Sequence, residues 1–378
     1  MTPLEESWLA LHLVERIGGK TLRRLLDAFG DVDSVLAAQA DAISRRCGLH
    51  PELAARVAKA REGSAFRTEK RLVAEHGVRL IPMDSADYPA RLGDVYLPPP
   101  LLYCKGSWPL PPGPWLAVVG TRGNSRYGER STRRLVEELA QQEPAAVIVS
   151  GLARGIDTVA HEQALACGLH TVAVLGGGLT GIYPPENGEL AERIQQRGAL
   201  LSEFPMTARP LARHFPIRNR VIGGLADAVL VVEAAARSGA LITASFALNY
   251  GRPVLAVPGN LDQPASEGAN RLIQSGQAAL VLGGADLLAA LRGARHAPAA
   301  QLDWLEPQAA PSAQPVPRAA VHEGEKGRIL QCLGKGALHP DELAGETGLP
   351  IERLIGLLLE LELSGDIYQT AESHYALA

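Results

Sequence analysis

Residues 199–233 read ALLSEFPMTARPLARHFPIRNRVIGGLADAVLVVE. The stretch begins and ends with short apolar runs, 199–204 and 227–233, which predict two buried strands of a sheet. The residues between them form a strand-to-strand connection, and we expect its short helix to start near Asn219. Open α/β sheets bind their ligands at the ends of strands, so this connection is the first candidate for a functional site.

The basic segment, residues 204–226, has the composition of a polyanion-binding site. It contains no Asp or Glu, and its four arginines are Arg209, Arg213, Arg218 and Arg220. Guanidinium groups pair with phosphates, and the ring of Phe215 offers a base a surface for stacking. Because the whole chain has a net charge of −4, the cluster does not follow from a basic composition. Single-stranded nucleic acid fits it best, and a solvated charged face is the alternative.

Composition sets the wider frame. A chain of 378 residues with 46% hydrophobic content has room for two or three domains. Its longest apolar runs have the length of strands, well short of the roughly 20 residues of a membrane span. Residues 1–6 lack the basic and apolar regions of a signal peptide. The four cysteines are scattered without metal-ligand spacing. We therefore expect a cytoplasmic protein with no membrane partner, no metal and no cofactor.

Four blocks follow along the chain. Residues 1–70 are helical in pattern, and the turn at 17–20 indicates either a helix-hairpin-helix or a small helical bundle. Residues 71–295 alternate short apolar runs with helix-like segments, which predicts a doubly wound, mostly parallel sheet. Residues 296–320 contain five Pro and eight Ala and predict an extended linker. Residues 321–378 give three helical segments and a short strand pair, the order of a winged helix.

The first strand of the sheet is followed by a glycine-rich turn, residues 120–128 (GTRGNSRYG). Its glycines fall at 120, 123 and 128, so the GxGxxG spacing of dinucleotide sites is absent. The next strand ends in Ser150-Gly151 and not in the acidic residue that binds ribose, which argues against an NAD enzyme. Outward-facing amides, with Arg122 among them and a helix behind, still predict an anion site.

The second strand leads into Ser150–His161, where Asp157 and His161 lie four residues apart on one helical face. A hydrolase built on Ser150, His161 and Asp157 is one interpretation. The GxSxG nucleophile elbow is missing, however, and helix capping explains the pair of residues more simply.

Taken together and in order, these motifs resemble the DNA-processing protein A family over nearly all of residues 71–295. The segments that carry the resemblance are Gly120–Arg122, Ser125–Gly128, Ser150–Asp157, Ala160–His161, Tyr183–Pro184, Ser202–Glu203, Phe215–Arg220, Glu233, Ser238–Gly239, Thr243–Ala244, Pro258–Gly259, Gly268–Asn270 and Leu272–Ile273. The resemblance implies an extended Rossmann-like domain between an N-terminal domain similar to SAM or helix-hairpin-helix modules and a C-terminal winged helix.

The resemblance also implies a binding protein and not an enzyme. It implies a homodimer that protects incoming single-stranded DNA and loads the RecA recombinase onto it in natural transformation. The DNA pocket would contain Arg122, Ser150, Gly151, Phe215, Arg218, Asn219 and Arg220. Arg126, Arg209 and Arg213 would flank it. The resemblance leaves open the preferred DNA length, the recombinase contacts, and the choice between transformation, repair or both.

Two other functions are compatible with the sequence, an enzyme and an interaction scaffold. A phosphoribohydrolase-like enzyme would need a PGGxGT-type loop, which residues 175–180 only faintly echo. A plain interaction scaffold would instead engage the arginines in salt bridges.

The charge-poor stretch 240–291 predicts the dimer surface. Residues 323–366 hold nine acids against four Lys and Arg, so we expect the winged helix not to bind duplex DNA.

Overall fold

The computed structural model describes residues 1–95, 97–296, 319–364, 366–370 and 374–377. The chain forms two compact units, the first comprising Met1–Glu15 with Arg23–His296 and the second Arg16–Leu22 with Ala297–Ala378. Within the described residues, no helix has the length and apolar character needed to cross a membrane.

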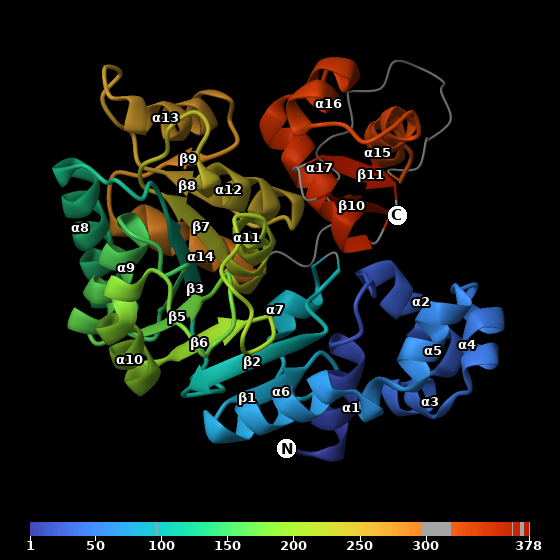
Figure 1. Cartoon of the computed structure of the whole chain (residues 1–378). Coiled ribbons are helices and arrows are strands. Elements are labelled where there is room, and N and C mark those ends of the chain that lie inside the picture. The colour runs from blue at the N-terminus through green and yellow to red at the C-terminus, as the bar shows by residue number, and fades with distance from the viewer. Residues whose placement is uncertain (96, 297–318, 365, 371–373, 378) are drawn as a thin grey trace. The chain divides into compact units, whose positions relative to one another are not determined.

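A nine-stranded, mostly parallel sheet forms the centre of the first unit (Figure 1). The strand order is β1-β2-β6-β5-β4-β3-β7-β8-β9. The strands are β1 (Arg79–Pro82), β2 (Leu101–Gly106), β3 (Trp115–Val119), β4 (Val147–Ser150), β5 (His170–Val174), β6 (Ala199–Ser202), β7 (Ala228–Val231), β8 (Val254–Ala256) and β9 (Ala279–Leu280). From β6 to β9 all neighbours are parallel, which confirms the doubly wound sheet.

Strands β1 and β2 form antiparallel pairs that were not predicted from the sequence. β1 pairs with β2, and β2 pairs with β6, so the sheet gains an antiparallel edge. β1 has only four residues and ends in a proline, and three consecutive prolines precede β2 at 98–100. Such short runs beside prolines carry little periodic signal.

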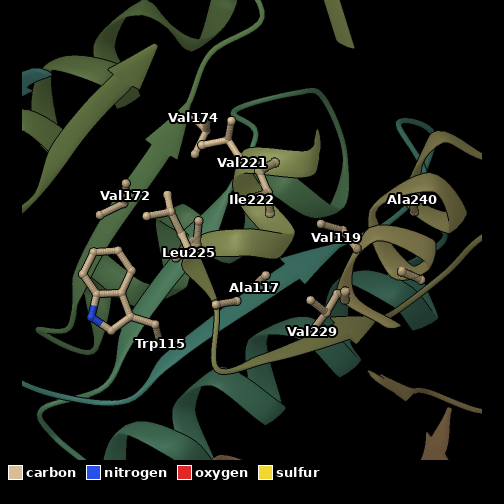
Figure 2. Packing of buried hydrophobic residues seen from close by; sticks show 14 of the residues in the cluster. Trp115, Ala117, Val119, Val172, Val174, Val221, Ile222, Leu225, Val229 and Ala240 are labelled. Carbon is tan, nitrogen blue, oxygen red and sulfur yellow. The ribbon is translucent and has the colours of Figure 1, made fainter. Parts of the chain in front are cut away.

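Helices cover both faces of the sheet. The helices of this region are α7 (Ala90–Gly93), α8 (Arg126–Gln142), α9 (Ile156–Ala166), α10 (Gly188–Arg197), α11 (His214–Leu225), α12 (Gly239–Asn249), α13 (Glu267–Gln274) and α14 (Gly284–His296), with 3₁₀ turns at Pro185–Asn187 (η2) and Pro264–Ser266 (η3). One apolar cluster joins the strands to α8, α9 and α14, and the other joins them to α11, α12 and α13. Figure 2 shows the second cluster, where Val221, Ile222 and Leu225 of α11 pack on Ala117 and Val172. Strands buried on both faces read as continuous apolar runs, which is why their positions were predictable.

Helix α11 begins at His214, which corrects the expected start near Asn219. Pro216 is the third residue of the helix, and a proline is tolerated in the first turn because that turn's N–H groups have no partner within the helix. The earlier start places Phe215 in the first turn and buries every residue from Arg218 to Leu225.

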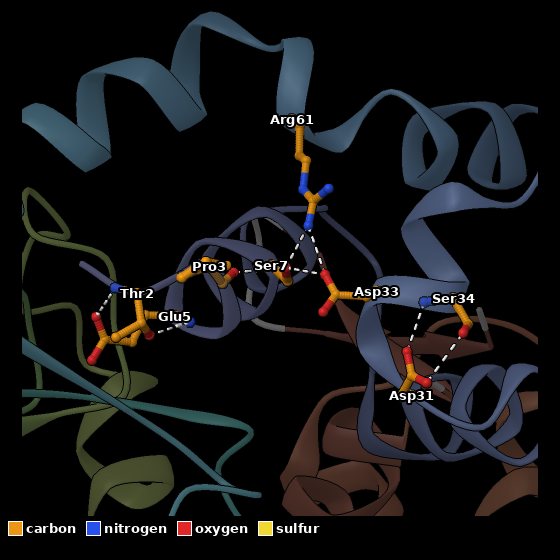
Figure 3. A network of polar contacts seen from close by, with 8 residues as sticks. All are labelled: Thr2, Pro3, Glu5, Ser7, Asp31, Asp33, Ser34 and Arg61. Atoms are coloured by element: carbon orange, nitrogen blue, oxygen red, sulfur yellow. Dashed lines mark hydrogen bonds and ion pairs between the residues drawn. The ribbon is translucent and has the colours of Figure 1, made fainter.

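The N-terminal helices are α1 (Pro3–His12), α2 (Gly19–Phe29), α3 (Val32–Ala37), α4 (Ala40–Cys47), α5 (Pro51–Ala58) and α6 (Ser64–Glu75), with a 3₁₀ turn at Ala60–Glu62 (η1). A polar network ties three of these elements together (Figure 3). Arg61 donates to Asp33 at 2.8 Å, and the Ser7 hydroxyl bonds both side chains. Helix α6 runs through residue 70, so the expected domain boundary falls inside a helix.

The second unit has its own apolar core. It contains α15 (Ala319–Leu333), α16 (Pro340–Thr347), α17 (Ile351–Ser364), β10 (Ile367–Gln369) and β11 (Tyr375–Leu377), with the two strands antiparallel. Three helices followed by a strand pair confirm the expected winged-helix order. Most of the expected linker, residues 297–318, lies outside the described residues.

Candidate nucleic-acid interface

A pocket of about 500 Å³, counting the open space at its mouth, lies at the carboxyl ends of β4 and β5. Loops that follow β3, β4 and β5 form its walls, together with the connection between β6 and α11. Its lining residues are Arg122, Gly151, Ala153, Arg154, Leu175, Gly176, Gly177, Gly181, Tyr183, Pro184, Pro210 and Phe215. Three of the residues predicted from sequence, Arg122, Gly151 and Phe215, therefore meet here.

The rim of the pocket combines cations with an aromatic ring. Arg122 and Arg154 are exposed, and Tyr183 retains 46% of its surface exposure. The Arg154 guanidinium pairs with the carboxylate of Glu186, and both side chains are about half exposed. Such an exposed ion pair contributes little stability, so Arg154 can exchange its carboxylate for another anion at small cost.

Phe215 supports the rim from below. Its ring lies 6.1 Å from the Tyr183 ring, and the guanidinium carbon of Arg122 lies 5.0 Å from its centroid. A side chain on Gly176 would press against the same ring. The Phe215 ring is thus already in contact on several sides, whereas the Tyr183 ring presents the open surface.

Arg218 lies beneath the pocket floor. The family resemblance places Arg218 in the DNA pocket, but the structure buries the residue, which is only 4% exposed. It donates to the carbonyls of Gly151 and Val174 and to the side chain of Asn219. Asn219 in turn donates to the Gly239 carbonyl at 3.1 Å. Burial lowers the pKa of Arg218 to about 10, with Asp157 acting in the opposite direction.

Arg220 also points inward, which corrects the second expectation of a phosphate contact in α11. Its guanidinium pairs with the buried carboxylate of Glu203 and donates to the Leu97 carbonyl at 2.9 Å. The helix buries this side of the basic segment, while Arg209 and Arg213 precede the helix and stay exposed. The exposed Arg126 lies at the start of α8.

Ser150, Asp157 and His161 do not form a catalytic relay. The Ser150 hydroxyl is fully buried and donates to the Val118 carbonyl at 2.6 Å, so it faces the core and not the pocket. His161 bonds through Nδ1 to the Thr171 hydroxyl at 2.7 Å. Asp157 does not cap α9, because its carboxylate accepts from the amides of Gly151 and Ala153, which precede the helix; local hydrogen bonding explains the residue. Among the described residues, no group of His, Cys, Asp or Glu is arranged to hold a metal ion.

Two amides of the glycine-rich turn, those of Ser125 and Gly128, already have partners within the protein. Glu233, directly after β7, accepts a hydrogen bond from the Ser125 amide at 2.9 Å and another from the Ser125 hydroxyl. The Ser125 hydroxyl itself accepts from the Gly128 amide at 3.1 Å. The carboxylate of Glu233 therefore occupies the helix start at which the sequence predicted an anion site.

Sequence reasoning did not assign Arg154 and Tyr183 to the site. Arg154 lies in the segment Ser150–Asp157, and Tyr183 lies in Tyr183–Pro184, both of which carry the family resemblance. Tyr183–Pro184 also follows a buried strand and a run of glycines at 176–178, and this position at a strand end is the signal that could have assigned it to the site. Two of those glycines allow a close approach, since a side chain on Gly177 or Gly178 would meet the backbone at 205–210. The pocket wall depends on this contact between the β5 loop and the basic segment.

The sequence matches a known family along most of its length. Residues 79–292 match the family described as DNA recombination-mediator protein A, and residues 307–372 match the DprA winged helix domain. Protein Smf of Escherichia coli (strain K12) is 42% identical over 289 residues, which cover 76% of this chain and 74% of that protein. The putative DNA processing protein DprA of Mycobacterium tuberculosis (strain ATCC 25618 / H37Rv) is 34% identical, covering 96% of this chain and 92% of that protein.

Two solved structures share the fold. DNA processing protein A from Streptococcus pneumoniae is 34% identical with a TM-score of 0.65, covering 76% of this chain and 98% of that one. The Helicobacter pylori protein, described as having a unique single-stranded DNA binding mode, is 31% identical with a TM-score of 0.50, covering 57% and 96%. The chain therefore belongs to the DNA recombination-mediator protein A family, which includes proteins named DprA and Smf.

Proposed function

We propose that this protein binds single-stranded DNA at the pocket beside Tyr183, protects it, and loads the RecA recombinase onto it. The observation that carries the proposal is a pocket whose rim combines one exposed aromatic ring with exposed guanidinium groups. This combination suits an unpaired strand, because the base stacks on the ring while phosphates meet the cations. The H. pylori relative, described as binding single-stranded DNA, supports the same ligand here.

We propose different roles for the exposed and the buried residues. We place a base on the Tyr183 ring and phosphates on Arg122 and Arg154, with Arg154 released from Glu186. Three exposed arginines that the sequence placed beside the pocket extend the path of the DNA strand, and they are Arg126, Arg209 and Arg213. The buried side chains beneath the pocket hold its floor in place, and they are Ser150, Arg218, Asn219 and Arg220.

The test is a titration of labelled oligothymidylate at several salt concentrations. Replacing Arg122 by Ala should weaken binding and reduce the salt slope, since each phosphate contact on a single strand contributes about 0.7 to that slope. Arg193→Ala is the matched control, because Arg193 is exposed on α10 and does not line the pocket. Equal affinities and salt slopes for the two variants would remove Arg122 from the interface. Duplex DNA of the same length should bind more weakly than the single strand.

We further propose a homodimer formed through residues 240–291. In this half of the sheet Leu280 and Leu282 lie at the edge strand β9 and are 44% and 71% exposed, and Leu261 is 90% exposed. Apolar side chains gathered at a sheet edge favour burial against another chain. Light scattering should report a dimer at micromolar concentration, and Leu282→Asp should shift it toward monomer. A wild-type monomer across that range would contradict the proposal.

RecA loading is tested separately, on DNA already coated with single-strand binding protein. Addition of this protein should shorten the delay before RecA filaments form. The Arg122→Ala variant should lose that effect in proportion to its loss of DNA affinity. An unchanged delay with saturating wild-type protein would confine the function to binding and protection.

A further inference from the structure

The side chain of Glu69 connects the N-terminal helices to the wall of the pocket. Glu69 lies on α6 and is 5% exposed, and its carboxylate accepts a hydrogen bond from the Met206 amide at 2.6 Å. Met206 belongs to residues 205–210, the wall segment, which follows β6 and ends at Pro210 in the lining of the pocket. Resting on the function proposed above, we propose that Glu69 is a positioning residue of the DNA pocket, which holds the wall segment and through it the loop that carries Tyr183.

Met206 is held from two directions. Its amide donates to Glu69, while its carbonyl accepts from the Thr180 amide at 3.2 Å and from the Thr180 hydroxyl at 2.7 Å. Thr180 lies in the loop between β5 and Tyr183, and Tyr183 carries the exposed ring of the rim. The carboxylate on α6 is therefore linked to this loop through a single residue, Met206.

The loop and the wall segment are also in close contact at Gly178. Its amide donates to the Ala208 carbonyl at 2.9 Å, and a side chain there would meet the carbonyl oxygens of Pro205 and Met206 at 2.2 and 2.0 Å. Closely packed elements transmit a displacement from one to the other. A wall segment released from α6 would therefore shift the loop as well.

Burial of a carboxylate at this position carries an energetic cost. Within the described residues no Lys or Arg pairs with Glu69, and an apolar side chain would avoid the cost of burying the carboxylate. Burial and the charge of Glu69 raise the pKa of Tyr103 on β2, which places the carboxylate beside the buried edge of the sheet. What the carboxylate adds is a strong acceptor for a backbone amide that would otherwise be buried without a partner.

The test compares variants of Glu69 by hydrogen exchange and by titration with oligothymidylate. Glu69→Ala should speed amide exchange in residues 203–213 and 176–184 by about ten-fold or more, because it removes a hydrogen bond to a charged group. The same variant should bind oligothymidylate about five-fold more weakly or worse. Glu69→Gln keeps an acceptor oxygen and should restore both measurements to within about two-fold of the wild type.

Val73→Ala is the matched control. Val73 lies one turn further along α6 and is 4% exposed, so its truncation removes buried methyl groups from the same helix and keeps the hydrogen bond of Glu69. The control should lower the melting temperature and leave exchange in the two segments and DNA affinity unchanged. Equal effects of Val73→Ala and Glu69→Ala would indicate a general loss of stability and overturn the inference.

Hydrogen exchange is measured without DNA, so it decides whether Glu69 holds the wall segment even if the wild type fails to bind oligothymidylate and the proposed function falls. Circular dichroism verifies folding. If Glu69→Ala does not fold, Glu69→Asp withdraws the acceptor by one methylene group and should produce the same two changes at smaller size. Wild-type exchange in the folded variant would overturn the inference. In a protein that binds DNA, faster exchange with unchanged DNA affinity would overturn it too.

Discussion

The guanidinium of Arg220 pairs with the carboxylate of Glu203 inside the protein, where the two side chains are 3% and 9% exposed. Glu203 directly follows β6 and Arg220 lies in α11, so the pair closes the connection that carries the exposed arginines. Burial raises the pKa of Glu203, and the charge of Arg220 opposes that rise. The pair joins the end of β6 to α11, and the segment between them contributes to the pocket wall.

Removing one partner of this pair should destabilise the fold. Arg220→Ala leaves the Glu203 carboxylate buried without its cation, and we expect a loss of about 3–5 kcal/mol in the free energy of unfolding. Urea titration measures the loss, with the exposed Arg213→Ala as control. An Arg220 variant as stable as the control, with DNA binding abolished, would show that Arg220 binds phosphate after all.

Tyr183 and Phe215 should separate binding from stability. Tyr183→Ala removes the exposed ring and should weaken oligothymidylate binding by about 1–3 kcal/mol with little change in salt slope or melting temperature. Phe215→Ala removes a ring held by Tyr183, Arg122 and Gly176, and should cost about 2 kcal/mol or more of stability. If Phe215→Ala instead lost affinity for oligothymidylate at an unchanged melting temperature, Phe215 and not Tyr183 would be the ring that stacks on a base.

Acid should destabilise the protein through His161. The Thr171 hydroxyl donates to the Ile148 carbonyl, so His161 Nδ1 is the donor to Thr171. Its buried Nε2 has no partner among the residues that the structure describes. Burial and the charge of Arg218 lower the pKa of His161 from 6.5 to about 3. The unfolded chain therefore binds this proton first, and the stability present above pH 6.5 is lost as pH falls toward 3.

The loss from this one histidine should reach about 2 kcal/mol at pH 5. Urea unfolding between pH 7 and pH 5 measures it, and His161→Gln should reduce the slope. Part of the slope should remain, because burial also lowers the pKa of His12 to about 4. Equal slopes for variant and wild type would rule out His161 as the source.

The winged-helix unit should not bind duplex DNA at physiological salt. Its helix α17 carries Arg353, which pairs with Glu325, while Lys326 of α15 pairs with Glu360 of α17. Arg353 and Lys326 are therefore matched by carboxylates, and Arg328 of α15 donates to the Thr347 carbonyl at 3.2 Å. DNA phosphates repel the excess of acids. Deleting the chain after His296 should change oligothymidylate affinity by less than about two-fold. Submicromolar duplex binding by residues 321–378, which have their own core, would contradict this prediction.

The sequence by itself determined the parallel sheet and the family. Strands such as Trp115–Val119 and Ala228–Val231 are buried on both faces of the sheet, so each appears in the sequence as an unbroken apolar segment. The glycine-rich turn and the basic segment also mark the right end of the sheet, because loops that follow parallel strands all meet at one edge.

Only the tertiary structure decided which charges face the ligand. Arg213 and Arg220 look alike in the sequence, yet one is exposed and the other is buried against Glu203. Likewise, the amides of the first turn looked open until Glu233, 108 residues away in sequence, proved to accept from Ser125. Burial and pairing depend on partners brought together by the fold, and sequence spacing carries no record of such distant partners.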